Sequence, residues 1–282
     1  MNFKEIFTHG WRLAFRSLQA MADLILPRVC VVCGDRLLLR EKHLCLHCLA
    51  DLPLTRFWEM KDNHMADKFN ALIQAGLEMT LETEYDADIP VVGRGPSIRC
   101  HEPYAHAAAL FFFSSEAPYR HILYNIKYEG RTDIGKHFGK MLGVRLAGSD
   151  VFKDVDCVMP VPLHWIRRWR RGYNQAEVIA REVASAMGAP LDCRTLVRRR
   201  RTRTQTRLDI QAKAANVAGA FEVRKGSKSR NRHQPTEIRH ILLIDDVFTT
   251  GSTLMACFTA LREVFPPGVR ISVATLAFVG GG

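Results

Sequence analysis

Four cysteines near the N-terminus have the spacing of a metal site. Two C-x2-C pairs, Cys30 with Cys33 and Cys45 with Cys48, are separated by eleven residues. Each pair can hold one side of a tetrahedral ion, and Gly34 permits the tight turn that aims the sulfurs inward. Disulfide bonds are the alternative, but a reducing compartment disfavours them. The spacing therefore predicts one structural zinc ion.

Other potential thiol and imidazole ligands are expected to take no part in this site. His43 and His47 lie between or beside the paired cysteines, yet four thiolates already complete a tetrahedral shell. The isolated Cys157, Cys193 and Cys257 fall in apolar stretches, where small buried thiols are common. We therefore expect these three thiols to be buried.

A second group of chemically active residues follows the apolar run at 241–244. It consists of two adjacent acids and a hydroxyl-rich loop, namely Asp245, Asp246, Thr249, Thr250, Gly251, Ser252 and Thr253. Because a helix is expected directly afterwards, the loop can present backbone N–H groups and hydroxyls to a phosphate, which the helix dipole also favours. Acids repel phosphate, so we assign them to sugar hydroxyls and a divalent cation. A phosphorylated ribose combines these features, whereas an ordinary capped turn between strand and helix is the alternative.

The chain is basic, and its excess charge is concentrated. Forty Lys and Arg residues against 29 Asp and Glu residues give a formal net charge of +11. Two runs without an internal acid carry much of it: Arg167, Arg168, Arg170 and Arg171, then Arg194, Arg198, Arg199, Arg200, Arg201, Arg203 and Arg207. Such a focused arginine field indicates an anionic partner, phosphate or nucleic acid. A solvated loop is the alternative.

Aromatic residues are interleaved with the first arginine run. Trp165, Trp169 and Tyr173 could provide faces on which the bases of a single strand stack. The same helical spacing also predicts that these rings pack in the core. Both interpretations are kept at this point.

Composition and length indicate a globular protein of about two domains. The chain has 282 residues, of which 47% are hydrophobic and 24% charged. Its longest apolar stretch, at 107–113, is far shorter than the roughly 20 residues that cross a bilayer, and the N-terminus lacks the features of a secretory signal. We therefore expect a cytoplasmic protein. Residues 1–27 predict an amphipathic helix ended by Pro27, which packs on the protein or lies on the inner face of the membrane.

The elements that position the acid and hydroxyl loop alternate between strand and helix. Apolar runs predict strands at 154–161, 241–244 and 271–278, and apolar spacing predicts helices at 176–187 and 254–265. This succession indicates a mostly parallel sheet with helices on its faces, an architecture that binds ligands beyond the carboxyl ends of its strands. By contrast, the acidic and irregular stretch at 51–88 is interpreted as part of a variable connector.

Residues 241–253, ILLIDDVFTTGST, resemble the phosphoribosyl diphosphate (PRPP) binding motif of type I phosphoribosyltransferases. Further motifs narrow the resemblance to the ComF/GntX family of competence-associated proteins. They are the N-terminal cysteine pairs, IKYEG at 126–130, PVPLH at 160–164, RGYNQA at 171–176, Gln205 and NVAGAF at 216–221. Many relatives carry a second set of cysteine pairs, but the corresponding stretch here, 90–103, retains only Cys100. One zinc ion, not two, is therefore expected.

The resemblance implies a role for each matching residue. Asp245 and Asp246 would form the ribose and magnesium side of the site, and residues 249–253 would cradle the 5′-phosphate. The pyrophosphate loop would consist of Pro160, Val161, Pro162 and Leu163. Arg167 and Arg171 would neutralise the diphosphate, and the arginine-rich run ending near Gln205 would be the flexible loop of the fold.

Four regions are expected on this basis. They are an amphipathic helix at 1–27, a zinc-binding module at 28–55, a variable connector at 56–103 and a phosphoribosyltransferase-like domain at 104–282. The resemblance implies a PRPP-binding protein that handles single-stranded DNA during uptake, with a DNA-translocation or membrane-associated partner. The alternative is an active transferase that moves phosphoribose from PRPP to an acceptor. The arginines at 198–203 are expected to contact nucleic acid phosphates without reading bases.

Overall fold

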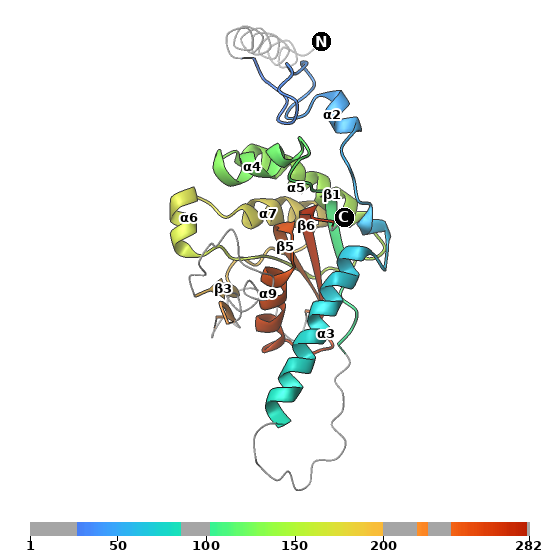
Figure 1. Ribbon diagram of the computed structural model, residues 1–282, viewed down its shortest axis with the longest axis vertical. Coiled ribbons are helices and arrows are strands. Elements are labelled where there is room, and N and C mark those ends of the chain that lie inside the picture. The colour runs from blue at the N-terminus through green and yellow to red at the C-terminus, as the bar shows by residue number, and fades with distance from the viewer. Residues whose placement is uncertain (1–26, 86–101, 200–218, 225–237, 281–282) are drawn as a thin grey trace, which may run out of the picture.

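The computed structural model describes residues 27–85, 102–199, 219–224 and 238–280, except for the side chains of 79–85 (Figure 1). The helix expected at 1–27, Cys100 and the part of the second arginine run from Arg200 onward lie outside the described residues. None of the helices in the described ranges is long and apolar enough to cross a membrane.

A four-stranded parallel sheet forms the centre of the molecule. Its strands are β1 (Ala107–Phe112), β2 (Cys157–Pro160), β5 (His240–Phe248) and β6 (Arg270–Phe278), in the order β1-β6-β5-β2. Residues 241–244 of β5 are fully buried. Since neighbouring side chains on a strand point to opposite faces, both faces of the sheet are covered. The predicted α/β fold with a parallel sheet is confirmed.

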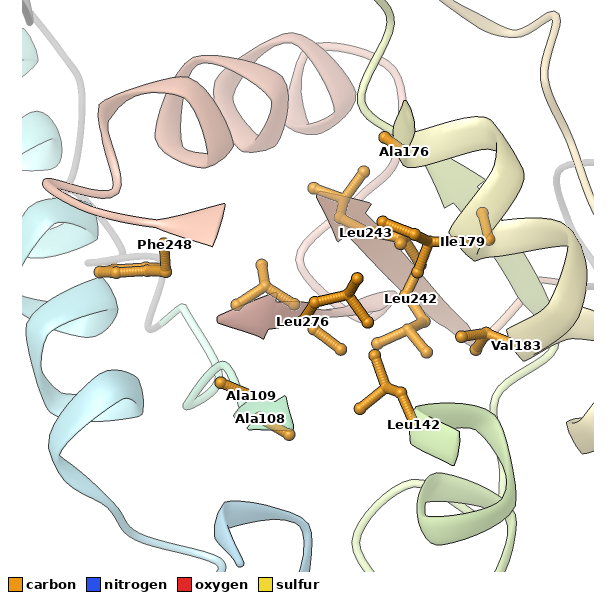
Figure 2. Packing of buried hydrophobic residues seen from close by; sticks show 14 of the residues in the cluster. Ala108, Ala109, Leu142, Ala176, Ile179, Val183, Leu242, Leu243, Phe248 and Leu276 are labelled. Atoms are coloured by element: carbon orange, nitrogen blue, oxygen red, sulfur yellow. The ribbon is translucent and has the colours of Figure 1, made fainter. Parts of the chain in front are cut away.

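One face of the sheet is covered by α5 (Thr132–Ala147) and α7 (Gln175–Met187), which pack on each other and on the strands. Figure 2 shows Leu142 of α5 and Val183 of α7 beside Leu242 of β5. All three side chains are completely buried. The helix predicted at 176–187 therefore forms where its apolar spacing places it, with the apolar stripe on the sheet.

On the other side lie α9 (Ser252–Arg262) and the long helix α3 (His64–Tyr85) (Figure 1). Phe69 of α3 makes edge-to-face ring contacts with Phe248 at the end of β5 and with Phe258 of α9. The chain enters α3 at Asn63, whose side-chain oxygen accepts hydrogen bonds from two backbone N–H groups of the first turn. This amide satisfies N–H groups that a helix start otherwise leaves without a partner.

The expectation of an irregular connector is wrong for the described part of 56–103. A short 3-10 helix, η1 (Phe57–Glu59), precedes α3, and the sheet-facing side chains of both are buried. Met65, Phe69 and Ile73 form the apolar stripe of α3. The described acids of α3, Asp67 and Glu78, lie on its exposed face. The acidic composition of the stretch obscured this helical period.

The remaining elements lie at the periphery. They are α2 (Leu46–Ala50), α4 (Arg120–Tyr128), α6 (Trp165–Arg171) and the antiparallel pair of β3 (Leu196–Arg198) and β4 (Phe221–Val223). Of the isolated thiols, Cys157 and Cys257 are buried as predicted, but Cys193 is exposed. Its neighbours, Asp192 and Arg194, are charged and lie at a bend before β3, so Cys193 stays at the surface.

Candidate functional site

The two acids lie within β5, near its carboxyl end. The sequence had predicted that they follow the strand. Asp245 pairs with Thr275 of β6, and its carboxylate accepts a hydrogen bond of 2.8 Å from the backbone N–H of Asp246. Burial, followed by the charge of Asp246, raises the pKa of Asp245 above its ordinary value. Two carboxylates this close in a largely buried setting favour a cation beside them.

A lysine from a distant segment meets this acid pair. Lys127 Nζ of α4 lies 3.2 Å from Asp246 Oδ2, and both side chains are largely buried. The sequence interpretation assigned no role to Lys127. The available signal was its place in the IKYEG motif at 126–130, but its partner becomes visible only when α4 is packed against β5.

The hydroxyl loop begins α9. Gly251 is the N-cap and adopts a left-handed conformation with φ of 78°. A Cβ atom at this position would lie 2.7 Å from Leu72 of α3 and 2.7 Å from Phe248. The loop therefore requires glycine for its conformation and for its close approach to α3. Thr250 Oγ1 and Ser252 Oγ are 2.9 Å apart, which places two hydroxyls at the positive end of the α9 dipole.

The predicted pyrophosphate loop, 160–163, lies on the neighbouring strand. Pro160 ends β2 and pairs with Ile244, the residue directly before the acids. The backbone N–H of Val161 donates to the Ile244 carbonyl at 2.8 Å, and Asn174 Nδ2 donates to the Val161 carbonyl at 3.0 Å. The structure thus brings this loop and the acid pair to one edge of the sheet.

Arg198 of the second arginine run lies on strand β3, not in the flexible loop that the resemblance implied. Arg198 is half-buried on β3, with its guanidinium 4.9 Å from the centre of the Phe221 ring. Burial lowers its pKa, as does the charge of Arg167, whereas Asp245 acts in the opposite direction. The charges of Arg167 and Asp245 therefore both act on the guanidinium of Arg198. Arg198 is packed against Phe221 and is not fully exposed to solvent, as a simple nucleic-acid contact would be.

Arg171 ends α6, one helical turn after Arg167. Its guanidinium is 5.5 Å from the centre of the Tyr128 ring of α4. Trp165 and Trp169 are exposed, and α6 has no buried residue. The interpretation that these tryptophans pack in the core is wrong, because four arginines among the seven residues of α6 leave no apolar face to bury.

The four N-terminal cysteines converge as predicted. The sulfur atoms of Cys30, Cys33, Cys45 and Cys48 all lie within 4.8 Å of one another. Cys33 Sγ and Cys45 Sγ are 3.7 Å apart, and a tetrahedral ion with Zn–S bonds of about 2.3 Å separates its sulfurs by about 3.8 Å. This cluster fits a zinc ion.

The chain is homologous to proteins named for DNA use and competence. Competence protein F of Haemophilus influenzae is 34% identical over 109 residues, which cover 39% of this chain and 45% of the relative. DNA utilization protein YhgH of Salmonella typhimurium is 29% identical over 136 residues, covering 47% and 56%, respectively. YhgH of Escherichia coli K12 is 26% identical over 140 residues, covering 49% and 58%. The chain spans about half the length of these curated relatives, and they confirm the resemblance predicted from the motifs.

No protein-family model matches the chain. Among solved structures, the chain is similar to glutamine phosphoribosylpyrophosphate amidotransferase from B. subtilis, complexed with ADP and GMP. The identity is 18% and the TM-score 0.33, with 53% of this chain and 30% of that chain covered. The description of the fold therefore rests on the sheet order and the helices themselves.

Proposed function

We propose that this homologue of Competence protein F and YhgH binds PRPP with Mg²⁺ and acts in the uptake or handling of single-stranded DNA. One observation carries the proposal. The acid pair, the loop 249–253 at the start of α9 and the loop 160–163 all lie at the carboxyl edge of the parallel sheet. In such sheets ligands bind at this edge.

Each part of the site matches one part of the ligand. Residues 249–253 would hold the 5′-phosphate with backbone N–H groups and hydroxyls. Asp245 and Asp246 would accept hydrogen bonds from the ribose hydroxyls and help to hold Mg²⁺, a hard cation that prefers carboxylate oxygens. Arg167 and Arg198 would neutralise the diphosphate beside the loop 160–163. The same diphosphate role for Arg171 remains a prediction from the family resemblance.

The DNA role rests on two separate observations. The relatives are named for competence and DNA utilization, and the chain has a concentrated arginine charge. We propose that PRPP binding regulates the DNA-handling role. The protein would work in the cytoplasm, at the inner face of the membrane. Residues 1–27 would contact the membrane or a DNA-translocation partner. We also propose that residues 28–55 form a zinc module and residues 104–282 a transferase-like domain. Helix α3 is assigned to the transferase-like domain, because it packs on β1 and α9.

The second candidate is an active phosphoribosyltransferase. An acceptor would attack the anomeric carbon of PRPP, the bond from that carbon to the diphosphate oxygen would break, and the diphosphate would leave with its Mg²⁺ charge compensation. The acid pair and the arginines favour this candidate, because they supply the PRPP half of such a site. Helix α3 lies beside the loop, since Leu72 approaches Gly251.

Pyrophosphate release distinguishes the two candidates. Purified protein is incubated with PRPP and Mg²⁺, with and without single-stranded DNA, while pyrophosphate is measured. Binding of PRPP and DNA without release supports the handling role, whereas release that needs a small acceptor and no DNA supports the transferase. Absence of PRPP binding in calorimetry would contradict both.

A further inference from the structure

An exposed group of aromatic rings lies beside the proposed PRPP site. Trp165 and Trp169 of α6 are 69% and 82% exposed, and Tyr124 and Tyr128 of α4 are 51% and 65% exposed. Isolated exposed aromatic residues are ordinary, but a local group of large rings marks an interaction surface. These four residues take no part in the core or in the PRPP site described above.

Contacts join the two tyrosines of α4 to the C-terminal end of α6 in one surface, here called the α4–α6 surface. The rings of Tyr124 and Tyr128 lie 5.1 Å apart, centre to centre. The guanidinium of Arg171, the last residue of α6, lies over the Tyr128 ring. Directly after α6, the Tyr173 hydroxyl donates a hydrogen bond to the Ile126 carbonyl of α4. Figure 1 shows the two helices on the same side of the molecule.

The charge of this surface selects its ligand. α6 carries four arginines and no acid, although Arg168 is engaged at 3.4 Å by Glu177. Flat rings and guanidinium groups together suit a ligand that has both exposed aromatic faces and phosphates. A single nucleic-acid strand offers both, whereas a duplex hides its base faces in the stack.

We propose that the α4–α6 surface binds single-stranded nucleic acid, with bases stacked on Tyr124 and Tyr128 and phosphates held by Arg170 and Arg171. This assignment rests on the proposed DNA-handling function and adds α4 to the arginine segment. It also places the strand beside the PRPP site, because Lys127, between the two tyrosines on α4, contacts Asp246.

The test compares a strand that has bases with one that lacks them. A fluorescent oligothymidine of about 20 nucleotides, longer than common site sizes, is titrated in anisotropy experiments beside an abasic strand of equal length. The wild-type protein should bind oligothymidine about tenfold or more tightly than the abasic strand, since each stacked base contributes substantially. The double variant Tyr124→Leu, Tyr128→Leu keeps apolar bulk and should lose most of this preference.

Two controls keep this inference separate from the proposed function. Tyr104→Leu removes another exposed tyrosine, one that contacts Asp67 and His106, and should bind both strands like the wild type. PRPP affinity, measured by calorimetry, should be unchanged in the Tyr124→Leu, Tyr128→Leu variant. Two outcomes would overturn the stacking site without affecting the proposal of PRPP binding. The first is equal affinity of the wild type for oligothymidine and the abasic strand. The second is an unchanged preference for oligothymidine in the Tyr124→Leu, Tyr128→Leu variant. No binding of either strand overturns both the surface and the DNA-handling role.

Discussion

Lys127 Nζ lies 3.2 Å from Asp246 Oδ2, so α4 is tied directly to the acid pair of the proposed PRPP site. The pair matters because Asp245 is also adjacent and burial disfavours two uncompensated carboxylates there. A lysine in this place balances part of the negative charge of the two acids. α4 therefore belongs to the site even though it lies outside the strand and loop motifs.

Replacing this lysine should weaken PRPP binding. Lys127→Met keeps the length of the side chain but removes its charge, and a charge-assisted contact contributes about 1.5–3 kcal/mol. We expect at least about tenfold lower affinity for PRPP with Mg²⁺ by calorimetry. Lys140→Met, an exposed position on α5, is the matched control. Unchanged affinity in Lys127→Met would remove Lys127 from the site.

The cysteine cluster should hold one zinc ion per chain. Cys45→Ser removes a thiolate from a closed four-ligand shell, so we expect loss of zinc, loosening of the module at 28–55 and a retained sheet. Zinc is measured by elemental analysis and folding by circular dichroism. Cys193→Ser, an exposed thiol outside the cluster, should keep the metal. Zinc-free wild-type protein, or full occupancy in a Cys45→Ser, Cys48→Ser variant, would contradict the assignment.

Gly251→Ala should destabilise the protein and distort the loop. The left-handed backbone costs alanine about 1–2 kcal/mol, and contact of its Cβ with Leu72 and Phe248 adds about 1–3 kcal/mol of overpacking. Denaturant unfolding should therefore show a free energy of unfolding lower by about 2–5 kcal/mol. Gly268→Ala is the control, because its added Cβ meets no atom within 4 Å. Equal destabilisation by both changes would show that the fit at Gly251 is not special.

The sequence predicted the parts of the fold that depend on local pattern. Apolar runs and helical spacing between 154 and 278 predicted β2, α7, β5, α9 and β6 in the correct order, because each element buries a periodic face against the same sheet. The cysteine cluster was predicted from spacing alone. Helix α3 was missed because the composition of 51–88 is acidic, although its buried stripe of Met65, Phe69 and Ile73 has a helical period.

Long-range contacts in the site could not be predicted in this way. Lys127 and Asp246 are more than one hundred residues apart in the chain, and only the packing of α4 on the sheet joins them. Helical spacing alone also could not show which side of α6 is covered, so it left burial and exposure of Trp165 and Trp169 open. The orientation of Arg198 toward Phe221 likewise depends on the pairing of β3 with β4.

Calorimetric titration of PRPP in the presence of Mg²⁺ tests the central claim most directly. The wild type is compared with the double variant Asp245→Asn, Asp246→Asn, which keeps the shape of the side chains but removes acceptor strength for the ribose hydroxyls and the negative charge beside the cation. We expect saturable binding in the wild type and at least about tenfold weaker binding in the variant, with circular dichroism showing a retained fold. Wild-type protein that does not bind PRPP, or a folded double variant that binds it with unchanged affinity, would contradict the account.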